Sequence, residues 1–130
     1  MIYIDTSAFY AIFDEDDANH KQAKKIWVAL IQSQETLACN NYVLVETNAL
    51  LQRRFGMSAV LDLQKIMPLL QVEWMTSEYH HFATTALLSV NLRDLSLADC
   101  SSFESMRRLG IEKVFAFDDH FRQQGFELVN

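Results

Sequence analysis

Four acidic residues each stand alone in a stretch of sequence that is otherwise uncharged and mostly apolar. They are Asp5 in residues 1–13, Glu46 in residues 36–52, Asp99 in residues 95–103 and Asp118 directly after the run 114–117. A carboxylate in a buried element loses its hydration, which is costly unless a cation compensates the charge. Hardly any lysine or arginine lies in these stretches. The pattern therefore predicts that a bound metal ion supplies the missing positive charge.

The chemistry that such a cluster favours is metal-assisted hydrolysis. Mg²⁺ and Mn²⁺ prefer oxygen ligands and are usually held by a few carboxylates. Two such ions about 4 Å apart can activate a water and stabilise the leaving oxygen of a phosphodiester. Each residue alone also has a structural interpretation, because an Asp after a strand often caps a helix and Ser96-x-x-Asp99 fits a capping box.

The elements that must position these carboxylates alternate between short strands and helices. Strands are expected at residues 2–4, 36–39, 72–75, 113–117 and 126–129. Helices are expected around 23–31, from a cap at Asn40 or Asn41 to Phe55, from a cap at Ser58 to Pro68, over 77–90, and from Ser96 to Leu109. Phe82, Ala86 and Leu87 are expected to face inward from the helix 77–90, and Phe103 to lie in the core.

Strands separated by helices require right-handed crossovers and a parallel sheet that is covered on both faces. We therefore expect an α/β fold with three α/β/α layers and a central, mostly parallel sheet of four to five strands. Sites in such sheets collect at the carboxyl ends of the strands, where Asp5 and Asp118 are placed. Glu46 would lie about a turn and a half into its helix, and Asp99 in the first turn of its own.

Length and composition limit the class of protein. The 130 residues predict a single domain spanning 1–130, with half of the residues hydrophobic. No apolar run reaches the roughly 20 residues that cross a bilayer, and the N-terminus has no signal-peptide pattern. Cys39 and Cys100 lie in apolar surroundings and are expected to be free thiols of a reducing compartment. These features predict a cytoplasmic protein.

The charge balance weakens a nucleic-acid hypothesis without excluding it. The net charge of −6 has the wrong sign for a general nucleic-acid binder. Two bound divalent ions would bring the net charge to −6 + 4 = −2. The short basic pairs Arg53-Arg54 and Arg107-Arg108 remain, and could line a groove.

Four short motifs around the acidic residues resemble those of PIN domains, in the same order and at similar spacings. They are Ile4-Asp5-Thr6-Ser7-Ala8-Phe9, Val45-Glu46-Thr47-Asn48-Ala49-Leu50, Ser96-Leu97-Ala98-Asp99-Cys100 and Phe117-Asp118-Asp119-His120-Phe121. The resemblance covers essentially the whole chain. The small size and the lack of appended domains are most similar to the VapC-type toxins of bacterial and archaeal toxin–antitoxin pairs.

This resemblance implies a metal-dependent endoribonuclease that acts on RNA, forms a homodimer and is inhibited by a small antitoxin. It also implies that the four acidic residues are catalytic ligands of Mg²⁺ or Mn²⁺, with Thr6 and Ser96 as supporting residues. The sequence departs from the family pattern at two positions. Ala116 stands where a Thr or Ser is frequent, and Asp119 stands where the family varies and is often basic.

Three further residues are candidates for substrate binding. Arg53 and Arg93 could guide RNA, although such residues are often solvated helix ends, and His120 could touch a phosphate or a metal. The alternative to an enzyme is a non-catalytic RNA-binding or protein-binding module on the same fold. The intact acidic positions argue against this alternative, whereas the negative net charge and Asp119 favour it.

A homodimer is also expected from the excess of apolar residues in the early helices. The residues concerned are Trp27, Ile31, Leu61, Leu63, Ile66, Leu69 and Leu70. Together they exceed what one thin sheet can cover, which favours a self-association surface.

Overall fold

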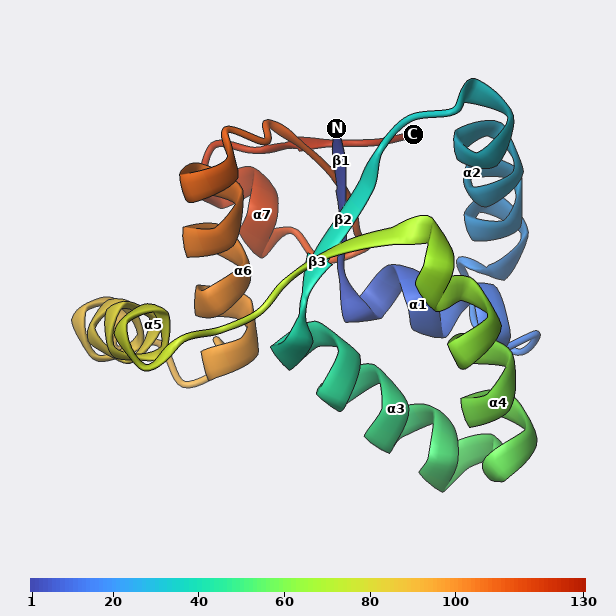
Figure 1. Ribbon diagram of the computed structural model, residues 1–130, viewed down its shortest axis with the longest axis horizontal. Helices are drawn as coiled ribbons and strands as arrows, with labels where there is room; N and C mark the ends of the chain where they lie inside the picture. The colour runs from blue at the N-terminus through green and yellow to red at the C-terminus, as the bar shows by residue number, and fades with distance from the viewer.

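A five-stranded, wholly parallel sheet lies at the centre of the computed structural model, which describes residues 1–130 (Figure 1). The strand order is β3-β2-β1-β4-β5. The strands are β1 (Ile2–Ile4), β2 (Leu37–Asn40), β3 (Leu70–Glu73), β4 (Lys113–Phe115) and β5 (Glu127–Leu128). The sheet confirms the predicted α/β class.

The register of the central strands brings their carboxyl ends together. Ile4 of β1 lies opposite Phe115 of β4, and the backbone N–H of Asp5 donates to the Phe115 carbonyl at 3.0 Å. β1 is entirely buried between two neighbours, which explains why it has no polar side of its own apart from the tyrosine hydroxyl. Residues that follow β1 and β4 therefore emerge at the same edge of the sheet.

Seven α-helices and one 3₁₀ turn connect and cover the strands. The helices are α1 (Thr6–Phe13), α2 (His20–Ser33), α3 (Asn41–Phe55), α4 (Met57–Ile66), α5 (Ser77–Val90), α6 (Leu97–Leu109) and α7 (His120–Gln123), and the 3₁₀ turn is Met67–Leu69. The pair α5–α6 lies on one side of the sheet, whereas α1, α2 and α4 lie on the other (Figure 1). None of these helices combines the length and the apolar character needed to span a lipid bilayer.

Several element boundaries differ from those expected. Residues 6–13 form the helix α1, which was not predicted, because Asp5 turns the chain directly from β1 into a helix that it caps. The third strand begins and ends two residues earlier than expected, since Met75 has already left the sheet to donate its N–H to Asn41. Strand β4 ends at Phe115, and the short loop after it carries Asp118.

The turn at Gly56 explains where α3 ends and α4 begins. Gly56 has φ +82° and caps the C-terminus of α3, as expected. The same residue precedes the first turn of α4, so that helix starts at Met57 and Ser58 is not its cap, contrary to the prediction. Asn40 is the residue that caps α3, and Pro68 stands in the 3₁₀ turn that follows α4.

The hydrophobic core surrounds the sheet and leaves α5 at its margin. Phe103 is buried, as expected, with its ring 5.0 Å from that of Phe121 in an edge-on arrangement. Phe82 is 46% exposed, so its predicted inward position is wrong. Helix α5 packs mainly on α6 and buries only Ala83 completely, which leaves Phe82 facing away and Ala86 and Leu87 half-buried.

The different surroundings of the two phenylalanines predict different costs of truncation. Phe103→Ala should lower the free energy of unfolding by about 3–5 kcal/mol, because it leaves a cavity in a packed aromatic cluster. Phe82→Ala, the matched control, should cost about 1 kcal/mol or less. Urea denaturation of both variants measures the difference. Equal losses would mean that Phe82 is covered in solution.

Candidate metal centre

The four isolated carboxylates line one pocket at the carboxyl edge of the sheet. The pocket has a volume of about 780 Å³ and includes Asp5, Glu46, Asp99 and Asp118 in its wall. These residues come from four separate elements of the chain: the end of β1, the middle of α3, the first turn of α6 and the loop after β4. Their convergence is a product of the parallel sheet, because none is a neighbour of another in sequence.

Asp5 is the most deeply buried of the four. Its Oδ2 accepts hydrogen bonds from the backbone N–H of Ser7 at 3.0 Å and from the Ser7 hydroxyl at 2.6 Å. Burial raises the pKa of Asp5 to about 6 against the opposing effect of these bonds, and the negative charges of Asp99 and Asp118 raise it further. A carboxylate with this pKa is ionised near neutral pH only at a cost, which a nearby cation would remove.

Asp99 both caps a helix and lines the pocket, so the two interpretations that the sequence allowed apply together. The Ser96 hydroxyl accepts from the N–H of Asp99, and Asp99 Oδ2 accepts from the N–H of Ser96, each at 3.0 Å. This reciprocal pair is a complete capping box. Burial raises the pKa of Asp99 despite these bonds, and Asp118 adds to the rise. The capping box therefore fixes the orientation of the Asp99 side chain but does not compensate the cost of its negative charge.

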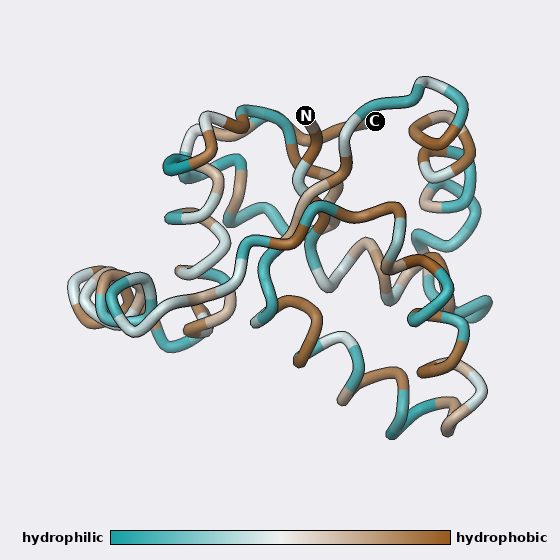
Figure 2. The backbone as a smooth tube through the Cα atoms, viewed as in Figure 1, coloured by the Kyte–Doolittle hydropathy of each residue, from teal (hydrophilic) through white to brown (hydrophobic).

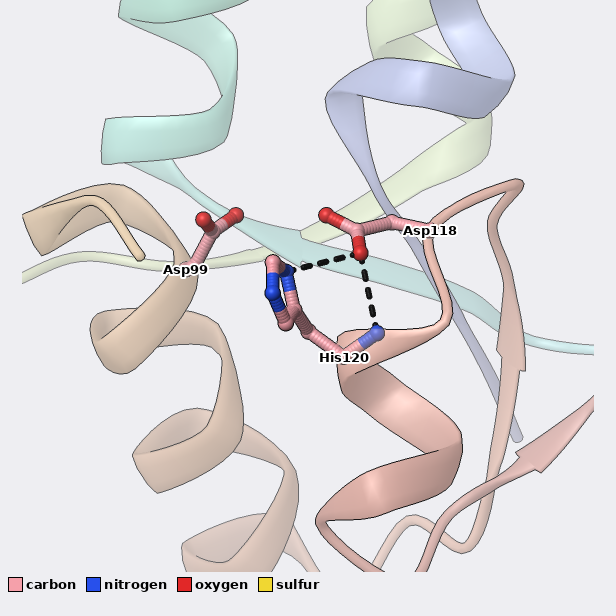
Figure 3. Close-up of side chains that lie close together, drawn as sticks. All are labelled: Asp99, Asp118 and His120. Carbon is pink, nitrogen blue, oxygen red and sulfur yellow. Dashed lines mark hydrogen bonds and ion pairs between the residues drawn. The ribbon is translucent and has the colours of Figure 1, made fainter. Parts of the chain in front are cut away.

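Asp118 and His120 form a pair beside Asp99. Asp118 Oδ1 accepts from the backbone N–H of His120 at 2.9 Å and lies 2.9 Å from His120 Nδ1, while His120 Nε2 lies 3.2 Å from Asp94 Oδ2. Burial lowers the pKa of His120, but the two carboxylates outweigh it and raise the pKa overall. One donor atom each from Asp99, Asp118 and His120 lies within 4.8 Å of the others, a spacing at which one metal ion could be held (Figure 3).

Glu46 reaches the pocket from α3, where it is half-buried. Burial raises the pKa of Glu46, the Thr6 hydroxyl opposes the rise, and the charge of Asp99 adds to it. Thr6 is itself held by neighbouring polar groups, since its Oγ1 donates to the Val43 carbonyl at 3.4 Å and accepts from the Thr47 hydroxyl at 3.2 Å. Thr6 therefore lies near Glu46 and is bonded to α3 through Val43 and Thr47, while its one hydroxyl proton is donated to the Val43 carbonyl.

Ser7 is a residue of the site that sequence reasoning missed. Its hydroxyl donates to Asp5 and accepts from the backbone N–H of Phe117 at 3.0 Å. These two bonds link the segment that carries Asp118 to the residues that follow β1. The hydroxyl comes from Ser7, because Ala116, which stands where a Thr or Ser is frequent, has none. The sequence does indicate this contact, because Ser7 stands two residues after Asp5. At that position the backbone N–H usually donates to the side chain of the residue that caps the helix.

The basic candidates separate into two groups. Arg53 and Arg54 both line the pocket, and Arg54 lies 3.9 Å from Asp16. Arg93 does not line the pocket, because it lies in the exposed connection between α5 and α6. Asp17 also lines the pocket and was not predicted, since it belongs to a run of four acidic residues that reads as a solvated turn.

The set of donor groups fits a hard divalent cation. No lysine or arginine forms an ion pair with any of the four carboxylates, and only His120 approaches one of them. All three carboxylates whose pKa is perturbed are shifted upward, so that burial and mutual repulsion exceed the available hydrogen bonds. Oxygen-rich sites of this kind suit Mg²⁺ or Mn²⁺.

Comparison with known proteins shows the family of this chain. The sequence profile of the PIN domain matches residues 2–127. The chain is 34% identical over 128 residues to the 23S rRNA-specific endonuclease VapC20 of Mycobacterium tuberculosis, covering 97% of this chain and 95% of that protein. The crystal structure of VapC20, described as a sarcin-ricin loop cleaving toxin, superposes with a TM-score of 0.86 at 32% identity, over 97% of this chain and 96% of that one.

A more distant structure shares the fold alone. PAE2754 from Pyrobaculum aerophilum superposes with a TM-score of 0.68 at 19% identity, over 98% of this chain and 88% of that one. The profile match, the identity to VapC20 and the agreement of the two folds lead to one conclusion. The chain belongs to the PIN domain family.

Proposed function

We propose that this protein is a metal-dependent endoribonuclease that hydrolyses phosphodiester bonds of RNA, and that it is the toxin of a toxin–antitoxin pair. The observation that carries the proposal is the convergence of four carboxylates from four elements in one pocket, with no lysine or arginine ion-paired to any of them. The similarity to VapC20, an endonuclease specific for 23S rRNA, supports structured ribosomal RNA as the class of substrate.

The four carboxylates would hold one or two Mg²⁺ or Mn²⁺ ions. When bound, such an ion would activate a water for attack on phosphorus and stabilise the negative charge on the leaving oxygen. The supporting residues keep the carboxylates in place, since Ser96 fixes Asp99 through the capping box and Ser7 fixes Asp5. Thr6 would support Glu46 less directly, through its hydrogen bonds to Val43 and Thr47 on the same helix.

The basic part of the pocket wall would bind the RNA backbone. Arg53 and Arg54 present guanidinium groups there, and guanidinium groups pair well with phosphate. His120 would act on the metal side, where it holds Asp118 and lies close to Asp99. Arg93 lies outside the pocket and would contact only an RNA segment that extends beyond it.

The partner and the compartment follow from the same proposal. A small antitoxin would block the pocket by inserting a basic or aromatic side chain among the carboxylates, because a cation there replaces the missing charge. The protein would act in the cytoplasm, in agreement with its two free, buried cysteines. A non-catalytic binding module on this fold is the rival function.

RNA cleavage by the purified protein should require Mg²⁺ or Mn²⁺. EDTA should abolish it, and Ca²⁺ should restore it poorly because its coordination is looser. The assay uses total RNA that includes ribosomal RNA, and the Asp118→Asn variant, purified identically, controls for contaminating nucleases. That variant should lose activity by at least about a hundredfold. Undiminished cleavage in EDTA would reject the metal mechanism, and no cleavage under any condition would favour the binding module.

Neutralising one carboxylate should separate stability from activity. In metal-free protein, Asp5→Asn should leave the free energy of unfolding unchanged or raise it by roughly 1 kcal/mol or more, because the ionised carboxylate is buried and repelled. An asparagine oxygen can still accept the two Ser7 bonds. Activity should fall at least about a hundredfold in the same variant. Thermal melts with and without Mg²⁺ measure the stability, which the metal should raise more in the wild type, and the RNA cleavage assay measures the activity.

The pH dependence of the metal-free protein provides the control for that variant. Because the folded pKa of Asp5 is about 6, above its ordinary value of 3.8, the folded state retains a proton that the unfolded chain has released between these values. The contribution of Asp5 to stability therefore falls as pH rises from about 4 to about 6 and is constant above that. Asp5→Asn should lack this decline. If the free energy of unfolding changes with pH in the same way in both proteins, the ionised Asp5 carboxylate does not destabilise the fold.

We also propose a homodimer, supported by exposed apolar residues on α2, on α4 and in the 3₁₀ turn after α4. Ile31, Leu61 and Leu69 are 41%, 60% and 51% exposed, whereas Leu63 is fully buried and belongs to the core instead. Hydrophobic stretches recur along α3 and α4 in Figure 2. Sedimentation should give about twice the 15.0 kDa chain mass. Leu61→Glu should yield a monomer and the control Leu88→Glu, on α5, should not. A monomeric wild type would reject the dimer.

A further inference from the structure

Hydrogen bonds of buried polar side chains hold α6 against the sheet. Each of the three strands β1, β2 and β3 contributes one residue to these bonds. The Tyr3 hydroxyl donates to Ser102 at 3.0 Å, Asn40 donates to Ser101 and Ser105, and Glu73 accepts from Ser105 and Arg108. Since α6 carries Asp99 in its first turn, these contacts determine where that carboxylate lies along the sheet edge.

Asn40 occupies the centre of this set and is completely buried. Its Oδ1 accepts from the backbone N–H of Val43 at 3.0 Å and so caps α3. Its Nδ2 donates to the hydroxyl of Ser101 at 3.0 Å and to that of Ser105 at 3.1 Å. One amide therefore joins the first turn of α3 to two successive turns of α6.

The orientation of this amide is dictated by its partners. The Ser101 hydroxyl already donates its proton to the Ala98 carbonyl at 2.6 Å, and the Ser105 hydroxyl donates its own to Glu73 at 2.8 Å. Both oxygens can therefore only accept from Asn40. A flipped amide would place its oxygen against two acceptors and its NH₂ against the Val43 N–H. The contact consequently has a single arrangement.

Asn40 thus lies between the supports of two pocket carboxylates. Glu46 lies on α3, six residues after Asn40, and Asp99 precedes Ser101 by two residues on α6. Strand β2 pairs directly with β1, which Asp5 follows. We infer that Asn40 is a positioning residue, which fixes α6 relative to α3 and thereby sets the separation of Glu46 and Asp99 for metal binding. This inference rests on the proposed function.

A helix cap alone does not account for this residue. Ser, Thr and Asp cap helices about as well as Asn. None of them can accept from the N–H of α3 and also donate twice across to α6. Apolar contacts would hold α6 on the sheet as well, but they permit small sliding motions that directional hydrogen bonds between buried groups resist. Ligand geometry commonly depends on such outer contacts.

Calorimetric titration of metal-free protein with Mn²⁺ alone tests the inference. Asn40→Ser keeps a capping hydroxyl but is too short to reach α6. The double variant Ser101→Ala, Ser105→Ala removes the same contact from the other side and leaves the cap intact. Each should raise the Kd for Mn²⁺ by about tenfold or more. Combining them should add little, because both remove one interaction.

Leu30→Ala on α2 is the matched control for lost stability. Leu30 is buried, but α2 carries none of the four carboxylates, so this variant should melt at a lower temperature with an unchanged Kd for Mn²⁺. The positioning role is rejected if the Kd for Mn²⁺ of the Asn40 and serine variants equals that of the wild type. It is also rejected if their Kd rises no more than the Kd of Leu30→Ala. A wild type that binds no Mn²⁺ would reject the metal centre itself, and the positioning role with it.

Discussion

The loss of hydration of carboxylates gathered in one pocket, increased by their mutual repulsion, is the constraint on which the rest of this structure depends. A parallel sheet sends the residues that follow β1 and β4 to one edge, and α3 and α6 add one carboxylate each to the same pocket. Without a cation, these groups oppose folding, as the raised pKa values of Asp5, Glu46 and Asp99 indicate. The core on both sides of the sheet must supply the free energy that offsets this cost.

The protein holds two of its four pocket carboxylates with the hydrogen bonds of helix capping. Asp5 caps α1 and Asp99 belongs to the capping box of α6, so each side chain has one oxygen committed to backbone N–H groups. Capping is a short-range and directional interaction, which makes the orientation of the carboxylate part of the secondary structure. The interpretation as a cap and the interpretation as a ligand, which are alternatives in the sequence, are compatible in the fold.

The fold class and the four acidic positions could be predicted because they depend on local patterns and on one general property of parallel sheets. The helix α1 could not, since its uncharged, apolar residues lack the periodicity that distinguishes a buried helix from a strand. Arg53 and Arg93 looked equivalent in sequence, and only the path of the chain places one in the pocket and the other outside. The role of Asn40 was invisible because its partners lie more than 60 residues away.

The uneven distribution of charge in the pocket has a consequence for how the protein would search for RNA. The chain as a whole is acidic, and its guanidinium groups at the pocket stand beside Asp16 and Asp17. Long-range attraction to phosphate, which lets basic proteins slide along any nucleic acid, is therefore weak. Encounters with bulk RNA would be brief, and residence would depend on short-range fit and on the ions in the pocket. Selectivity would then arise from rapid rejection of wrong sequences more than from tight capture of the right one.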